Sequence, residues 1–234
     1  MNARARTVMI TGAAGNLGRA VARSFRAEGA RLVLVDLRRD GLEAAFAAED
    51  ERLLFAPANL LEQTQASGAA KAALERFGRI DVLCNLAGGF RMGETVHETA
   101  DKNWDFLFDI NARTLLHAVR AVVPHMIESG GGKIVNVGAF AAQKGLAGMG
   151  AYGAAKGAVI RLTEAMAAEL REKNINVNCV LPTIIDTPEN RAAMPDADPS
   201  RWVAPEDLAS AIAFLASNGA RAIHGATLPV TALS

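Results

Sequence analysis

Two residues of this sequence, Tyr152 and Lys156, have types and a spacing that suit proton transfer. They lie four positions apart in a segment with helical periodicity, so their side chains would share one face of a helix. A phenol with a pKa of about 10 is a poor acid at neutral pH unless a nearby cation stabilises its phenolate. We therefore predict that Tyr152, the only tyrosine, donates a proton to a carbonyl or imine, and that Lys156 lowers its pKa.

The apolar run before this pair, KIVNVGAF at 133–140, ends in Ala139 and Phe140. A site of this kind usually holds the reacting oxygen with a hydroxyl or an amide, and Ala139 offers neither. Losing one donor at a developing oxyanion costs on the order of a hundred- to thousandfold in rate. The sequence therefore indicates either a replacement donor, such as Gln143 or the backbone near Phe140, or an acceptor that spreads its charge over a conjugated ring.

A glycine-rich turn, TGAAGNLG at 11–18, joins the first apolar strand to a helix. Gly12, Gly15 and Gly18 allow a tight turn and a close approach of backbone to a pyrophosphate, which the N–H groups at the helix start would bind. The next strand ends at Asp36, where a carboxylate can accept from ribose hydroxyls and would repel a 2′-phosphate. The pattern favours NAD(H); because Arg38 and Arg39 follow, it does not exclude NADP(H).

Short apolar runs alternate with longer helical stretches along the whole chain. The runs are apolar throughout, as in parallel strands covered on both faces, and the helix-length connections agree with parallel pairing. We predict an α/β fold with one doubly wound sheet of about seven strands in a single domain, 1–234. The expected strands are Thr7–Thr11, Arg31–Asp36, Arg52–Ala56, Asp81–Asn85, Lys133–Gly138, Asn176–Leu181 and Ala226–Val230. The expected helices are Leu17–Glu28, Leu42–Glu49, Gln63–Phe77, Lys102–Glu128, Ala151–Lys173 and Pro205–Ala216.

The polar, proline-rich stretch at about 183–204 follows the sixth strand, at the edge where open α/β sheets bind ligands. We interpret it as a lid over the substrate rather than as a linker.

Composition excludes several classes of function. Lys plus Arg and Asp plus Glu each total 25, so nothing favours nucleic acid or an anionic membrane as a partner. No apolar run approaches the roughly 20 residues that span a bilayer, and the N-terminus carries no signal-peptide pattern. Cys84 and Cys179 lie in apolar runs without metal-ligand or disulfide spacing, and the four histidines are scattered. We expect a cytoplasmic protein without a metal site.

These motifs make the chain resemble the short-chain dehydrogenase/reductase family over essentially its whole length. The resemblance is carried by TGAAGNLG, by NLAGG at 85–89, by Asn111, by YGAAK at 152–156 and by LPTIIDTP at 181–188. It implies a Rossmann-type fold, Tyr152 as the acid–base, Lys156 also holding the nicotinamide ribose, and Asn111 anchoring a relay water. Thr183 stands where many members have glycine, and Ala139 where most have serine.

The resemblance and the motifs together predict a set of cofactor contacts, of which Pro182 and Thr187 belong to the nicotinamide end. The set is Gly12, Ala14, Asn16, Leu17, Gly18, Asp36, Leu37, Asn59, Leu60, Asn85, Ala87, Gly88, Tyr152, Lys156, Pro182, Ile185 and Thr187.

The second half resembles quinonoid dihydropteridine reductases more closely, in GAFAAQKGLAGMGAYGAAKGAV and in LPTIIDTPENRAAMPDADPSRW. Those enzymes use NADH and also have a small apolar residue at the serine position. The resemblance implies a flat, conjugated acceptor in a slot for which we name Ala139, Phe140, Phe90 and Met194.

Three functions stay open at this point: an NADH-dependent reductase of a pterin-like substrate, a reductase or dehydrogenase of a ketone, an alcohol or a 3-oxoacyl thioester, and a nucleotide-binding regulatory module with weak or no catalysis. The wide apolar faces of 102–128 and 151–173, together with the family resemblance, predict a homodimer or homotetramer.

Overall fold

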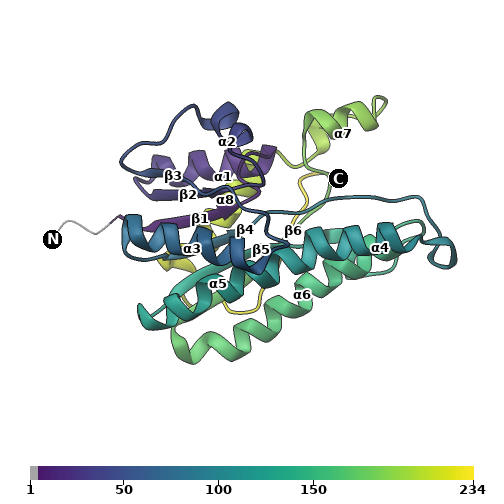
Figure 1. Cartoon of the computed structure of the whole chain (residues 1–234). Coiled ribbons are helices and arrows are strands. Elements are labelled where there is room, and N and C mark those ends of the chain that lie inside the picture. Colours follow the sequence, from purple (N-terminus) through teal and green to yellow (C-terminus); the bar gives the residue numbers. More distant parts are fainter. Residues whose placement is uncertain (1–4) are drawn as a thin grey trace.

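The computed structural model describes residues 5–234, so the first four residues of the predicted domain lie outside it. Seven parallel strands form one sheet in the order β3-β2-β1-β4-β5-β6-β7 (Figure 1). The predicted single-domain, doubly wound fold is confirmed. The strands are β1 (Thr7–Thr11), β2 (Arg31–Val35), β3 (Leu53–Phe55), β4 (Val82–Asn85), β5 (Gly132–Val137), β6 (Ile175–Pro182) and β7 (Thr227–Val230).

The order of the sheet reverses beside β1, because the chain runs outward to β3 and then returns to place β4 on the other side of β1. The loops that follow β1 and β4 therefore leave the sheet in opposite directions. This switch point opens a crevice at the carboxyl ends of the strands.

Helices cover both faces of the sheet and divide the core in two. One half packs α3, α5 and α6 against residues such as Met9 and Val33, and the other packs α1 and α8 against Val8 and Ile10 (Figure 1). Alternate strand residues are thus buried on opposite faces, which explains the continuous apolar runs. The helices are α1 (Asn16–Ala27), α2 (Arg39–Phe46), α3 (Gln63–Phe77), α4 (Asp101–Phe108), α5 (Thr114–Glu128), α6 (Gly150–Leu170), α7 (Pro188–Ala193) and α8 (Pro205–Leu215).

The predicted helix 102–128 is wrong as a single element. A π-helical turn, Asp109–Arg113, separates α4 from α5 and contains Asn111. Such turns are concentrated at functional sites, and they are too short to alter the apolar pattern of the sequence. The predicted helix Leu42–Glu49 also ends early, at Phe46, because Ala47 takes a φ of +65°.

The predicted lid, 183–204, is not all loop, since it contains the short helix α7. Thr187 caps this helix by accepting from the backbone N–H of Asn190 at 3.2 Å. The two ends of the segment pair with each other, Asp186 N with Val203 O and Val203 N with Ile184 O, both at 2.8 Å. The segment is therefore a loop that leaves the carboxyl end of β6 and whose two ends are joined by backbone hydrogen bonds.

Thr183, the residue found where many family members have glycine, has a structural partner. Its hydroxyl donates to the carbonyl oxygen of Thr231 at 3.1 Å and lies 2.7 Å from Oγ of Ser234. Figure 1 shows the C-terminal end of the chain beside the base of this segment. The threonine thus joins the segment to residues 231–234.

A buried polar chain ties α6 to the centre of the sheet. Asn85 Nδ2 donates to Asn136 Oδ1, and Asn136 Nδ2 donates to Thr163 Oγ1, both at 2.9 Å. All three side chains are buried on β4, β5 and α6. Each supplies a partner that the next would otherwise lack, so this chain helps to set the position of α6 and the two residues it carries, Tyr152 and Lys156.

Asn136→Ala should lower the free energy of unfolding by about 2–4 kcal/mol, because it leaves the Asn85 amide N–H without its acceptor in the core and removes the donor to the Thr163 hydroxyl, which keeps its bond to Val159 O. Urea unfolding followed by circular dichroism measures the change. Asn218→Ala, at an exposed position, is the control and should change the value by less than about 0.5 kcal/mol. An equal change in the free energy of unfolding for both variants would show that the hydrogen bonds of Asn136 contribute nothing to stability.

Candidate active site

A pocket of about 550 Å³ lies at the carboxyl edge of the sheet, over the switch point. It is bordered by glycine backbone, by the ends of β2 and β4, and by Thr187 from the segment predicted to be a lid. Most of the predicted cofactor contacts line it: Gly12, Ala14, Asn16, Leu17, Gly18, Asp36, Leu37, Asn59, Leu60, Ala87, Gly88 and Thr187. Asn85, Tyr152, Lys156, Pro182 and Ile185 do not.

The glycine-rich turn has the shape that a pyrophosphate requires. Gly12 has a φ of +64°, and a Cβ on Gly18 would lie only 2.3 Å from the carbonyl oxygen of Gly12. Helix α1 starts directly after Gly15 without a side-chain cap, so no side chain occupies the N–H groups of its first turn. These features fit a dinucleotide whose phosphates lie at the helix start.

Asp36 both braces this turn and borders the pocket. Its Oδ2 accepts from the backbone N–H of Ala14 at 2.9 Å, and its Oδ1 accepts from Leu37 N at 2.8 Å. Each carboxylate oxygen can accept a further bond, so room for a ribose hydroxyl remains. Arg38 pairs with Asp40 at 3.2 Å, and Arg39 pairs with Glu43 and Glu49.

The three predicted catalytic residues come together beside this pocket. Lys156, only 6% exposed, donates from Nζ to the carbonyl oxygen of Val137 at 2.9 Å. Asn111 Nδ2 donates to Gly89 O at 3.0 Å and to Leu107 O at 2.9 Å. A Cβ on Gly88 would lie 2.9 Å from Asn111 Oδ1 and 3.2 Å from Lys156 Nζ. Asn111 Oδ1 and Lys156 Nζ therefore both lie against Gly88, and Tyr152 is one helical turn from Lys156.

Burial shifts both members of the proton-transfer pair. It raises the pKa of Tyr152 to about 12 and lowers the pKa of Lys156 to about 8. The pKa of Tyr152 is thus raised in the protein alone, because burial removes the phenolate from water; that Lys156 lowers it stays a prediction. At neutral pH, Tyr152 is consequently a protonated phenol.

The four predicted substrate contacts differ in how they are placed. Phe90 packs against Tyr152 edge to face, with ring centroids 4.8 Å apart, and is 53% exposed. Ala139 is buried directly before a short 3₁₀ turn that starts at Phe140, whose ring is partly exposed. Met194 follows the last residue of α7. Of these, Phe90 alone has an aromatic contact with Tyr152 within residues 5–234.

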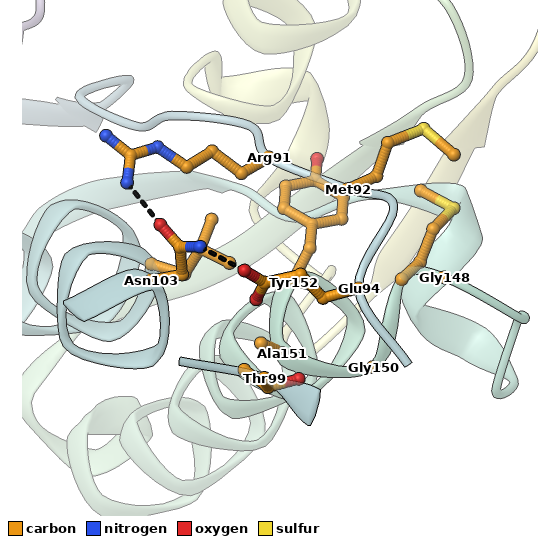
Figure 2. A pocket seen from close by; sticks show the side chains of 11 residues that line it. Arg91, Met92, Glu94, Thr99, Asn103, Gly148, Gly150, Ala151 and Tyr152 are labelled. Atoms are coloured by element: carbon orange, nitrogen blue, oxygen red, sulfur yellow. Dashed lines mark hydrogen bonds between the residues drawn. The ribbon is translucent and has the colours of Figure 1, made fainter. Parts of the chain in front are cut away.

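A second pocket beside Tyr152 holds residues that the sequence reasoning missed. Arg91, Glu94 and Asn103 supply its polar groups (Figure 2). They belong to no motif: Arg91 and Glu94 lie in the loop after β4, Asn103 lies on α4, and no local pattern joins them.

Residues 5–234 show neither a metal-binding cluster nor a membrane-spanning helix. No group of three or more His, Cys, Asp or Glu side chains in this range is arranged to hold a metal ion. Within the same range, no helix combines the length and apolar character that crossing a membrane would take.

Lys156→Met should change how stability depends on pH. Because the pKa of Lys156 falls from 10.5 to about 8 on folding, the unfolded chain binds more protons than the folded one between these values. Lys156 therefore disfavours folding below about pH 8, and its contribution to stability rises as pH increases to about 10.5. Over this window, the free energy of unfolding of the wild-type protein should rise relative to that of the variant by on the order of a few kcal/mol.

Urea unfolding at about pH 7 and about pH 10 measures this gain. Lys71→Met, at an exposed position, should show a flat difference from the wild type. A flat difference for Lys156→Met as well would contradict the lowered pKa.

Comparison with known proteins agrees with this geometry. A model of the short chain dehydrogenase family matches residues 6–198. The chain is 33% identical to D-threitol dehydrogenase of Mycolicibacterium smegmatis, over 96% of this chain and 91% of that protein. It superposes on carveol dehydrogenase from Mycobacterium avium in complex with NAD with a TM-score of 0.89 and 29% identity, over 97% of this chain and 96% of that one. It also superposes on 3-ketoacyl-(acyl-carrier-protein) reductase from Brucella melitensis complexed with NADH, with a TM-score of 0.87 and 29% identity over 97% of both chains. This chain therefore belongs to the short-chain dehydrogenase/reductase family and is an oxidoreductase.

Proposed function

We propose that this oxidoreductase is NAD(H)-dependent and that Tyr152 is the group that donates or accepts the proton. The observation that carries the proposal is the position of Gly88, which lines the dinucleotide pocket and lies against both Asn111 Oδ1 and Lys156 Nζ. NADH, when bound, supplies the hydride. Two solved relatives contain NAD or NADH, and the ion pairs of Arg38 and Arg39 with carboxylates leave Asp36 as the charge facing the ribose. These points favour NAD(H) over NADP(H).

The protonation state of Tyr152 agrees with a role as proton donor. Its phenol keeps its proton at neutral pH, but burial raises its pKa to about 12 and makes it a weaker acid in the protein alone, so a cation must stabilise the phenolate as the proton leaves. Lys156, whose ammonium donates to Val137 O, would stabilise the phenolate that remains and would bind the nicotinamide ribose. Asn111, with its side chain fixed by Gly89 and Leu107, would anchor the water that returns a proton from solvent.

For the acceptor we propose a flat, conjugated molecule of the quinonoid dihydropterin type. Ala139 provides no hydroxyl for a localised oxyanion, while a conjugated ring spreads its charge over several atoms. The Phe90 ring packed on Tyr152 offers an apolar wall for such a ring. The lid 183–204, which we propose covers the substrate, carries the sequence resemblance to dihydropteridine reductases.

A ketone, alcohol or 3-oxoacyl thioester is the second candidate substrate. The named relatives favour it, since they are a D-threitol dehydrogenase, a carveol dehydrogenase and a 3-ketoacyl-(acyl-carrier-protein) reductase. With such a substrate, another donor must replace the missing hydroxyl. A regulatory module without catalysis is the weakest alternative, because nucleotide binding alone does not require Asn111, Tyr152 and Lys156 together.

The proposal extends to assembly and location. Trp104 is exposed on α4 and stacks on Phe108 with centroids 4.5 Å apart, which favours burial of this face in a homodimer or homotetramer. Cys84 and Cys179 are both buried and unpaired, as expected in the reducing cytoplasm.

Tyr152→Phe should lower turnover by on the order of a hundred- to ten-thousandfold, because it removes the transferable proton but keeps the ring. NADH oxidation, followed by absorbance with quinonoid dihydrobiopterin and with an acetoacetyl thioester, measures the loss. NADH affinity, measured by fluorescence titration, should stay unchanged. Undiminished turnover would remove Tyr152 from the mechanism.

Ala139→Ser separates the two acceptor classes. The new hydroxyl should raise turnover of the acetoacetyl thioester by about tenfold or more, and should change turnover of the pterin much less. Ala141→Ser, two residues further on, is the matched control. Equal effects on both acceptors would undo the argument from charge delocalisation, and thioester turnover without pterin turnover would favour the second candidate.

A further inference from the structure

The pocket beside Tyr152 that contains Arg91 has a volume of about 200 Å³. Whole-ligand sites are larger, roughly 300–1,000 Å³, so this pocket suits one substituent of a substrate. Because Tyr152 forms part of its wall, the substituent would belong to a molecule that reacts at Tyr152. The pocket is lined by Arg91, Met92, Glu94, Thr99, Asn103, Leu107, Gly148, Met149, Gly150, Ala151 and Tyr152.

Two contacts hold the guanidinium of Arg91 in one orientation. It lies 3.8 Å from the centroid of the Phe106 ring, and its Nη1 donates to Asn103 Oδ1 at 2.6 Å. A guanidinium fixed in this way loses little freedom when it binds a ligand. Figure 2 shows it turned toward Asn103 and away from the hydroxyl of Tyr152. Arg91 therefore acts on a group remote from the reacting bond and does not replace the hydroxyl missing at 139.

Glu94 fixes Asn103 rather than Arg91. Its Oε1 accepts from Asn103 Nδ2, so the amide oxygen of Asn103 faces the guanidinium, and its Oε2 accepts from Ala100 N at 3.3 Å. Within residues 5–234, no carboxylate forms an ion pair with Arg91, and its Nε and Nη2 make no hydrogen bond. The pocket thus presents an ordered cation with donors to spare.

We propose that this pocket is a subsite for a carboxylate on the non-reacting end of the substrate, with Arg91 as its ligand. The fork of a guanidinium matches the two oxygens of a carboxylate. Glu94, beyond Asn103, favours a single negative charge over a doubly charged phosphate. Met92, Leu107 and Met149 provide apolar walls for the adjoining carbon atoms. The inference rests on the proposed function, because it takes Tyr152 as the reacting centre.

The test compares acids with their uncharged esters. Pterin-6-carboxylate and 5-oxohexanoate, each beside its methyl ester, are titrated by calorimetry into the protein loaded with NAD⁺, which cannot donate a hydride. At least one acid should bind the wild-type protein about tenfold or more tighter than its ester. Arg91→Gln should abolish that preference, and Arg91→Lys should keep part of it. Arg120→Gln, at an exposed position on α5, is the matched control and should keep all of it.

Two results would overturn the subsite: no acid binding tighter than its ester, or an Arg91→Gln variant that weakens acid and ester equally. The second would show that Arg91 only shapes the pocket. Failure of the proposed function is a separate outcome, seen as absent turnover with every acceptor. It leaves the ratio of acid to ester affinity measurable, because the titration needs no reaction.

Discussion

Close approach of the backbone after β1 and after β4 is the constraint on which this site depends. A Cβ on Gly12 would lie 2.9 Å from the backbone nitrogen of Ala87, and a Cβ on Gly88 would lie 2.9 Å from Asn111 Oδ1. Any larger residue would push the two loops apart. The same closely packed backbone therefore lines the dinucleotide pocket and contacts the predicted catalytic residues Asn111 and Lys156.

Burial shifts the pKa values of Tyr152 and Lys156 in opposite directions. The same loss of water that keeps the Tyr152 phenol protonated makes Lys156 easier to deprotonate. The hydrogen bond from Lys156 to the carbonyl oxygen of Val137 offsets part of this cost. Separate hydrogen bonds along Asn85, Asn136 and Thr163 join the same helix, α6, to the sheet. In the protein alone, Tyr152 keeps its proton at neutral pH.

Ala139 and Arg91 bear on two different parts of the proposed substrate. The absence of a hydroxyl at 139 bears on the bond that reacts, since it favours a molecule that spreads charge. The ordered cation in the neighbouring pocket bears on the part that does not react. Binding energy from such a remote group can be used to hold the reacting bond in place. A flat acceptor with an acidic substituent would satisfy both features.

The sequence by itself determined the sheet, the dinucleotide turn and the helix that carries Tyr152 and Lys156. Continuous apolar runs, glycine spacing and a four-residue interval are local patterns that report directly on geometry. Only the tertiary structure decided the π-helical turn around Asn111, the raised pKa of Tyr152 and the Arg91 pocket. These depend on contacts between segments far apart in the chain and on exclusion of water, as when α4 brings Phe106 and Asn103 to a loop arginine. No local pattern records which groups come together in space, and for that reason the residues that we propose bind the remote end of the substrate were not predicted from the sequence.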